Sequence, residues 1–224
     1  MSRKSTPKPA ASPGRPKDLT KRAAILDAAE RMFLQHGYEG VSMDQIAAEA
    51  GVSKLTVYSH FGDKDALFAE AARAYCEQQM PASVFAPAPG TPLRERLMEI
   101  ARAFFAMVFS PEAVAGHRLL CTPQMVDRGL AKLFWEGGPM RVQSAFAELL
   151  RQRTAAGELE IADIPRASAQ FFTLLKGDLH ARLVFQCCDD EQMCEAHREA
   201  HIEASVDMFL RAYATAGQDS RPRP

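Results

Sequence analysis

Apolar side chains recur at intervals of three and four residues along most of the chain after residue 18. This spacing places them on one face of an α-helix and is typical of amphipathic helices. The first such segment has its apolar positions between Ala24 and Phe33 and ends at Gly37, a residue that suits a helix C-terminus. A first helix is therefore predicted near 20–36. Since the sequence has no strand-like alternation and no Asn-Gly or Asp-Gly hairpin turn, the expected fold class is all-α.

Two short helices are predicted next, separated by a tight turn. The run Ser42-Met43-Asp44-Gln45 is a capping box, in which the serine accepts a hydrogen bond from the third backbone N–H and the glutamine reaches back. Ser53 suits the N-cap of the following helix, which is expected over 54–60. The intervening Ala50-Gly51-Val52 is short enough to make the pair a helix-turn-helix.

A proline-rich stretch over 81–92 divides the chain. Because its four prolines cannot continue a helix, we expect a linker there between two domains. A fourth helix is predicted before it over 64–80, and further helices are predicted after it over 93–109, 111–121, 126–135, 140–155, 165–186 and 190–214. The expected organisation is an arm over 1–18, a helix-turn-helix domain over 19–80, the linker, a larger helical domain over 93–216 and a tail over 217–224.

The charge of the chain is distributed unevenly. Residues 1–22 hold seven of the 27 Lys and Arg residues and one acidic residue, a net charge of +6, so the formal total of −1 leaves −7 for the rest. A basic arm on an acidic body is typical of a chain that binds a polyanion, because cationic side chains release the counterions condensed on phosphates. The alternative is a tail that only improves solubility.

Composition also limits the compartment. The longest unbroken apolar run, Ala103 to Phe109, is too short to span a bilayer, and no apolar segment follows the first basic residues as in a secretory signal. The five cysteines form no CxxC pair, which argues against a disulfide framework. We therefore expect a cytoplasmic protein with reduced thiols and no membrane partner.

The N-terminal part of the sequence resembles the DNA-binding domain of the TetR family of bacterial regulators. The resemblance covers about 50 residues and rests on the string Ala24-Ile25-Leu26-Asp27-Ala28-Ala29, Phe33, Gly37-Tyr38, Ser42, Ile46-Ala47, Ala50-Gly51-Val52-Ser53, Thr56, Tyr58, His60-Phe61, Lys64 and Leu67. Beyond residue 93 the layout is similar to the regulatory domain of an AefR-like subgroup. The resemblance implies a DNA-binding regulator, most simply a repressor released by a small apolar or aromatic effector. A regulator without a ligand is the alternative.

The third helix fits a helix that lies in the major groove, with Val57 and Phe61 facing the domain and a short polar face turned outward. The resemblance implies phosphate contacts for Thr56, Tyr58, His60 and Lys64, with base edges facing Lys54, Leu55 and Ser59. Ser42 and the free backbone N–H groups at the start of the second helix favour another phosphate contact, and Ser53, the N-cap of the third helix, is a further DNA-binding candidate. The expected partner is double-stranded DNA with a palindromic site. A helix pair used only for protein packing is the alternative interpretation.

The larger domain is rich in aromatic and methionine side chains, most of which we expect in the core. The resemblance implies a ligand cavity among them, and soft side chains suit an adaptable site. The candidates for lining it are Phe104, Phe105, His117, Arg118, Cys121, Trp135, Phe171 and His180. Each polar candidate has a purely structural role as its alternative.

A palindromic site requires a homodimer, since two recognition helices must lie one DNA turn apart, about 34–36 Å. We expect the last two helices to form a four-helix bundle with those of a second copy. The predicted interface residues are Phe172, Leu175, Leu179, Val206, Phe209 and Tyr213. The competing interpretation is that these faces are used within one subunit.

Enzymatic function is not expected, because the sequence contains no P-loop, GxGxxG, HExxH or GxSxG motif. An all-α enzyme similar to a glutathione transferase is the alternative from another class. Cys194, His197 and His201 lie on one helical stripe that could ligate zinc, but the glutamates between them favour a solvated face. The sequence thus predicts no catalytic residue, metal or cofactor.

Overall fold

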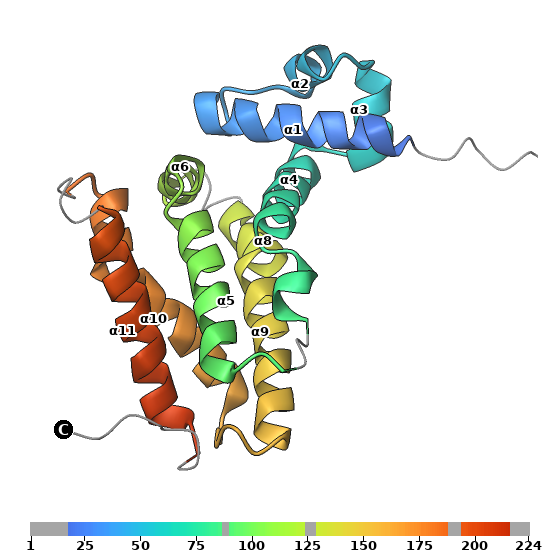
Figure 1. The fold of residues 1–224 in the computed structure, drawn as a ribbon. Coiled ribbons are helices and arrows are strands. Elements are labelled where there is room, and N and C mark those ends of the chain that lie inside the picture. The colour runs from blue at the N-terminus through green and yellow to red at the C-terminus, as the bar shows by residue number, and fades with distance from the viewer. Residues whose placement is uncertain (1–17, 87–89, 124–128, 188–193, 216–224) are drawn as a thin grey trace, which may run out of the picture.

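The computed structural model describes residues 18–86, 90–123, 129–187 and 194–215 (Figure 1). The helices are α1 (Leu19–His36), α2 (Met43–Glu49), α3 (Lys54–Phe61), α4 (Lys64–Gln79), α5 (Leu93–Val108), α6 (Pro111–Leu120), α8 (Leu130–Gly137), α9 (Pro139–Ala155), α10 (Ile164–Val184) and α11 (Glu195–Tyr213), with a 3-10 turn, η1 (Ala82–Phe85), after α4. The predicted all-α class is confirmed. Residues 1–17, the tail over 217–224 and the predicted helix starts at 126 and 190 lie outside the described residues.

The N-terminal helices begin where the sequence supplies capping side chains. Asp18 accepts hydrogen bonds from the backbone N–H groups of the first turn of α1. Ser42 and Gln45 form the predicted capping box of α2, with both of its hydrogen bonds present. Ser53 caps α3 and Asp63 caps α4 in the same way. Local chemistry thus sets the start of each element of the helix-turn-helix.

These four helices share one hydrophobic core at the upper end of the molecule in Figure 1. Phe33 of α1 stacks on Tyr38 at 5.7 Å between ring centroids, and Phe68 of α4 meets both rings edge-on. Leu130, the first residue of α8, is fully buried in the same core. The larger C-terminal part of the chain therefore contributes directly to the packing of the N-terminal domain.

A second core lies between α5, α9, α10 and α11, which form the long body below the N-terminal helices (Figure 1). Phe146, Phe171, Phe172 and Phe209 cluster at its centre, with ring centroids between 4.6 and 6.2 Å apart. Residue 214 returns to the α9–α10 turn, where Leu159 and Ala214 form an isolated β-bridge.

The stretch over 81–92, expected as a linker, is partly structured. Its first residues form η1, and Phe85 is buried in the second core. The guanidinium of Arg96 donates to the backbone oxygens of Ser83 and Ala86, which holds this turn against α5. Segment 87–89 lies outside the described residues.

α10 is broken at Gly177, whose φ of 51° and ψ of −155° are far from helical values. His201 of α11 lies against the break, and its Nε2 is 3.1 Å from the backbone oxygen of Leu175. The predicted helix over 165–186 therefore consists of two helical parts that meet beside α11.

The expected dimer surface is corrected by this packing. Phe172, Leu175, Val206 and Phe209 are buried in the second core, because α10 and α11 turn these side chains toward α5 and α9, and Leu179 is also buried within the protomer. Tyr213 is half-buried, and its hydroxyl donates to Gln170. For these residues the competing interpretation, use within one subunit, is the one that applies.

Candidate nucleic-acid interface and cavity

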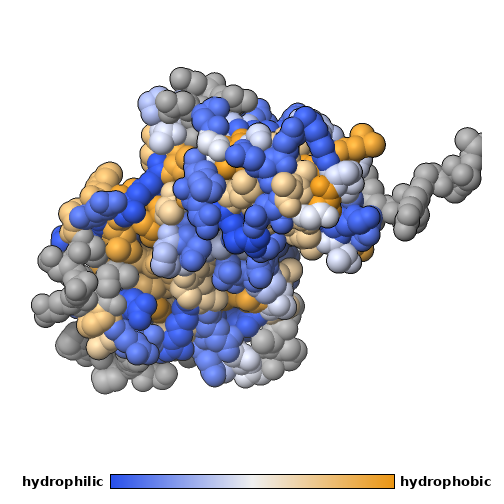
Figure 2. Space-filling model, turned by 90° about the horizontal axis from the view of Figure 1, so that it is seen from above, coloured by the Kyte–Doolittle hydropathy of each residue, from blue (hydrophilic) through white to orange (hydrophobic). Residues whose placement is uncertain are grey.

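α3 presents its predicted outward residues to solvent. Leu55 is 79% exposed and Tyr58 is 41% exposed, whereas Val57 and Phe61 are buried beneath them. Seen from above, the surface over α1, α2 and α3 is largely hydrophilic (Figure 2). A protruding helix with a polar outer face and an apolar inner face has the shape that the major groove admits.

The outermost cation of α3 is already paired within the domain. Lys54 Nζ lies 2.8 Å from a carboxylate oxygen of Asp44 on α2 and 5.8 Å from the centre of the Tyr58 ring. The hydrogen bond to Asp44 raises the pKa of Lys54. A phosphate or base that binds Lys54 must therefore compete with a carboxylate on the same surface.

The hydroxyl groups of this surface serve the helix starts. Ser53 Oγ lies 2.8 Å from Thr56 Oγ1 and accepts from the Thr56 N–H, while Ser42 Oγ accepts from Gln45. Ser59 Oγ donates to the Thr56 backbone oxygen at 2.8 Å. The Ser59 hydroxyl is thus oriented to accept, not to donate, toward an incoming base.

His60 and Lys64 lie at the C-terminal end of the same face. His60 is half-buried beside Phe61, and its Nδ1 is buried without a hydrogen-bond partner. Lys64 Nζ sits 4.1 Å from the centre of the Tyr38 ring, and the Tyr38 hydroxyl donates to the Asp65 carboxylate. Tyr38 therefore positions the amine that the resemblance assigns to a phosphate.

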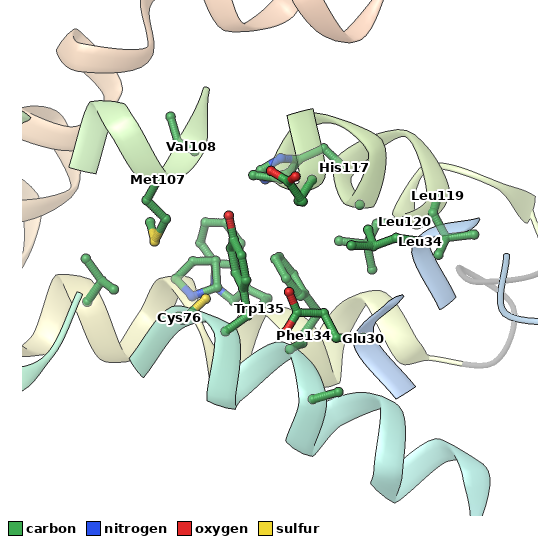
Figure 3. Close-up of a pocket in the computed structure, with 18 of the residues that line it drawn as sticks. Glu30, Leu34, Cys76, Met107, Val108, His117, Leu119, Leu120, Phe134 and Trp135 are labelled. Atoms are coloured by element: carbon green, nitrogen blue, oxygen red, sulfur yellow. The ribbon is translucent and has the colours of Figure 1, made fainter. Parts of the chain in front are cut away.

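A cavity of about 180 Å³ lies between the N-terminal domain and the body (Figure 3). Its walls come from α1, α4, α5, α6, α8, α9 and α10, and most of the lining is apolar. Of the predicted lining residues, Phe104, His117 and Trp135 face it. Trp135 is 50% exposed, which places it at the rim.

The other five candidates lie elsewhere. Arg118 donates through Nε to the backbone oxygen of Val184 at 2.8 Å and also bonds Leu183, so it caps the C-terminus of α10. Cys121 is exposed beyond α6. Phe105 and Phe171 belong to the second core, and His180 lies behind His117 without lining the cavity.

Several lining residues carry functional groups that the sequence prediction missed: Glu30, Tyr75, Cys76, Glu112 and Lys176. Glu30 and Tyr75 lie on helices that the sequence assigns to the N-terminal domain, whereas the cavity is expected in the larger domain. The sequence therefore gives no signal for them. Lys176 had a recognisable signal, because it is the one cation within the apolar run from Phe171 to Gly177.

Burial changes the electrostatics of this cavity. Desolvation lowers the pKa of Lys176. Desolvation and, to a smaller extent, Lys176 lower the pKa of His117, and desolvation with smaller contributions from His117 and Lys176 lowers that of His180 to about 4. Desolvation and the nearby Asp27 and Glu112 carboxylates raise the pKa of Glu30. The thiol of Cys76 is also buried, and its pKa rises to about 11.

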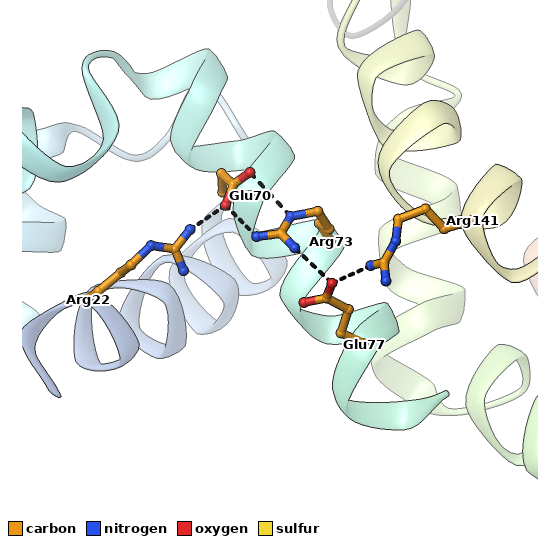
Figure 4. A network of polar contacts seen from close by, with 5 residues as sticks. All are labelled: Arg22, Glu70, Arg73, Glu77 and Arg141. Carbon is orange, nitrogen blue, oxygen red and sulfur yellow. Dashed lines mark hydrogen bonds and ion pairs between the residues drawn. The ribbon is translucent and has the colours of Figure 1, made fainter. Parts of the chain in front are cut away.

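A chain of ion pairs connects the two parts of the molecule beside the cavity (Figure 4). Arg22 of α1 bonds Glu70 of α4, and Glu70 also pairs with Arg73 at 2.8 Å. Arg73 pairs with Glu77 at 2.7 Å, and Glu77 is 2.5 Å from Arg141 of α9. α4 is thus bonded on one side to the helix-turn-helix and on the other to the body.

The stripe considered for zinc has a different arrangement in the structure. His201 is turned to the Leu175 backbone oxygen, while Cys194 and His197 are exposed. Within the described ranges, no group of three or more His, Cys, Asp or Glu side chains could hold a metal ion. In those same ranges, none of the helices combines the length and hydrophobicity needed to cross a membrane.

Two family models match the sequence. Residues 25–71 match the bacterial regulatory proteins of the tetR family, and residues 95–215 match the C-terminal domain of AefR-like transcriptional repressors. The chain is 40% identical over 57 residues to the HTH-type transcriptional repressor AcnR of Corynebacterium efficiens, which covers 25% of this chain and 30% of that protein. It is 33% identical over 100 residues to the HTH-type transcriptional activator FasR of Mycolicibacterium smegmatis, 45% of each chain. The matched part thus spans less than half of these relatives.

Solved structures match over a much larger part of the chain. A TetR-family transcriptional regulator from Mesorhizobium loti is 28% identical with a TM-score of 0.74, covering 88% of this chain and 98% of that one. The flavonoid-responsive regulator FrrA is 33% identical with a TM-score of 0.71, covering 89% of this chain and all of FrrA. These relatives are regulators and not enzymes, which excludes the all-α enzyme alternative. With both of its domains matched, the chain belongs to the TetR family of bacterial DNA-binding transcriptional regulators.

Proposed function

We propose that this protein is a cytoplasmic repressor that binds a palindromic operator as a homodimer and leaves it when a small molecule occupies the cavity. The observation that carries the proposal is the composition of the cavity wall. Glu30, Phe33 and Leu34 of α1 line it together with α5, α6, α9 and α10. A ligand in this position contacts the DNA-binding domain and the body at once.

α4 is the element through which occupancy acts on DNA binding. Its first half supplies Leu67, Phe68 and Ala71 to the N-terminal core, and its second half supplies Tyr75 and Cys76 to the cavity wall. A ligand that displaces the second half therefore also moves the helix-turn-helix. Because a ligand shifts a conformational equilibrium only by its differential affinity, the released state must have the better-formed cavity.

The ion-pair chain holds α4 to both α1 and α9 during this movement. Arg22 holds α1 to Glu70, and Arg141 holds α9 to Glu77. With α4 paired to α1 at Glu70 and to α9 at Glu77, we expect α1 and α4 to move together. The displacement then changes the spacing of the two recognition helices in the dimer, on which a palindromic site depends.

The dimer surface that we propose is the outer face of α10 and α11. The exposed residues Ala181 and Phe185 lie on the second part of α10, and Ala196, Ala200, Ala204 and Met208 recur at intervals of four along α11. Hydrophobic surface gathers on the side of Figure 2 that corresponds to α10 and α11 in Figure 1. Small residues beside Phe185 and Met208 allow helices of a second copy to approach closely.

Binding selection from random duplexes, followed by gel shifts with the upstream region of the protein's own gene, tests the DNA-binding part. Tyr58→Phe and Lys64→Ala are expected to weaken binding to all sequences, whereas Lys54→Ala and Ser59→Ala are expected to change the selected sequence. Binding without sequence preference would contradict the proposal.

A reporter gene under the selected operator tests the direction of regulation. Deletion of the regulator raises expression if it is a repressor and lowers it if it is an activator, as FasR is named. The effector is tested by adding candidate ligands to the operator complex. If filling the cavity with Ala72→Trp leaves the operator complex unaffected by every ligand that releases the wild type, the cavity is the effector site; if release persists, it is not.

A further inference from the structure

Three basic side chains gather where α6 and α10 meet beside the mostly apolar cavity. His117 and Lys176 line it, and His180 lies behind them with its ring perpendicular to that of His117, 4.7 Å between centroids. Phe109 meets the His180 ring edge-on at 5.8 Å. These three residues form the basic end of the cavity.

The three basic side chains have no acidic partner among the residues that the structure describes. Lys176 makes no ion pair with a described residue, whereas several arginines of the same domain are each paired with an Asp or Glu: Arg94, Arg96, Arg153 and Arg182. The Nε2 atom of His180 is buried without a hydrogen-bond partner. Burial lowers the pKa of all three groups, because their charged forms are poorly solvated at this end of the cavity.

Two acidic side chains, Glu30 of α1 and Glu112 of α6, also line the cavity. Burial raises the pKa of Glu30 and of Tyr75, with a further contribution from the Glu112 carboxylate, whereas neither Glu30 nor Glu112 contributes to the lowered pKa of His117, Lys176 or His180. The Tyr75 hydroxyl shares a 2.8 Å hydrogen bond with Ser110. A second negative charge on the ligand would be repelled by these carboxylates, so the cavity favours a ligand with one acidic group.

Resting on the proposed function, we infer that the effector is a small organic acid whose single carboxylate or phenolate binds at Lys176 and His117 and whose apolar body fills the rest of the cavity. The volume limits that body. An apolar protein cavity of roughly 150 Å³ holds benzene, and the cavity here measures about 180 Å³. The body is therefore about one aromatic ring in size, packed between Phe104, Phe134 and Met107.

Matched probes separate the charge of the ligand from its shape. Benzoate and cinnamate are acids, benzamide and cinnamamide are their neutral counterparts, and benzylamine carries the opposite charge. Calorimetric titration at pH 7.5 is expected to show each acid binding ~10-fold or more tightly than its amide, because a charge-assisted hydrogen bond is about twice as strong as a neutral one. Benzylamine is expected not to bind.

Lys176→Met tests the residue that carries the inference. Methionine keeps the length of the side chain and removes its charge, so the acid-to-amide affinity ratio is expected to fall to about one while amide binding persists. Lys132→Met is the matched control, because Lys132 lies on α8, pairs with Glu136 at 3.8 Å and does not line the cavity. Thermal unfolding of both variants establishes that each is folded.

The inference is overturned if the amides or benzylamine bind as well as the acids, if the acid preference survives in Lys176→Met, or if no acid binds at millimolar concentration. Operator binding measured on the same preparations separates this failure from that of the proposed function. If the protein still binds its operator but shows no preference for acids, the proposed function stands and only the inference about the effector is wrong. If the protein binds DNA without sequence preference, the proposed function is wrong. The ligand affinities of the free protein then still show whether the cavity prefers acids.

Discussion

His201 of α11 donates from Nε2 to the backbone oxygen of Leu175 at 3.1 Å, two residues before the glycine at which α10 leaves helical geometry. The break at Gly177 interrupts the helical bonding of the first part of α10, and the imidazole provides a donor there. A Cβ at Gly177 would lie 3.0 Å from His201 Cε1. Both the positive φ and the close ring therefore require glycine at this position.

Gly177→Ala is expected to lower the free energy of unfolding by about 1–3 kcal/mol, through backbone strain and displacement of the imidazole. Gly157→Ala is the matched control, because Gly157 also has a positive φ of 76° but no atom within 4 Å of the added Cβ. Urea denaturation measures both variants. Equal losses would show that the contact with His201 adds nothing.

Val206→Glu and Met208→Glu are expected to have different effects, because Val206 lies in the protomer core and Met208 on the proposed dimer surface. Val206 is fully buried, so a glutamate there places a charge in the core and unfolds the protein. Met208 is 56% exposed on the adjacent face of α11, so Met208→Glu should leave helicity intact and yield a monomer. Circular dichroism and light scattering after gel filtration distinguish the two results. A dimeric Met208→Glu protein that binds operator would contradict the proposed surface.

Asp44→Asn is expected to strengthen DNA binding. The substitution frees Lys54 from its 2.8 Å ion pair and removes a negative charge from the DNA-facing side of α2. If Lys54 then binds a phosphate, the slope of log affinity against log salt steepens by ~0.9. Titration at several salt concentrations measures this slope. Asp27→Asn, on the exposed side of α1 and paired with Arg31, is the control.

Deletion of residues 1–17 is expected to weaken DNA binding and flatten its salt dependence. These residues carry five Lys and Arg and no acid, so up to five phosphate contacts are lost, each worth ~0.9 in the slope. Binding to operator and to random duplex should fall together, because phosphate contacts carry no sequence information. An unchanged slope would show that the segment serves solubility alone.

The stability of the protein is expected to fall as the pH drops below about 6.5. His180 has its pKa lowered from 6.5 to about 4 by burial and the neighbouring His117 and Lys176. In that pH range the unfolded chain binds a proton that the folded chain does not, so the free energy of unfolding decreases with falling pH. Denaturation at pH 7, 6 and 5 measures the trend. His180→Gln should reduce it, whereas the exposed His197→Gln should not.

The parts of the fold that depend on neighbouring residues were predicted well from the sequence. The caps Ser42, Ser53 and Asp63 act over three or four residues, so the starts of α2, α3 and α4 agree with prediction. The family resemblance was carried by the same short segment and is confirmed.

The parts that depend on distant packing were not predictable in this way. Periodicity shows that Phe172 and Val206 lie on apolar faces, but it does not show which helix covers them, and the covering helices belong to the same protomer. The break at Gly177 leaves no trace in the hydrophobic period. Arg118 illustrates the same limit, because the backbone oxygens that it caps lie more than 60 residues away along the chain.

The participation of α1 in the cavity wall has a thermodynamic consequence for the DNA itself. If occupancy lowers operator affinity by some factor, the operator must lower ligand affinity by the same factor, since the coupling free energy is shared. The operator is then an inhibitor of ligand binding, and each molecule of the regulator has a different ligand threshold on and off the DNA. In a dimer, two cavities are linked to one operator, so release by the ligand should be steeper than binding of the ligand to the free protein.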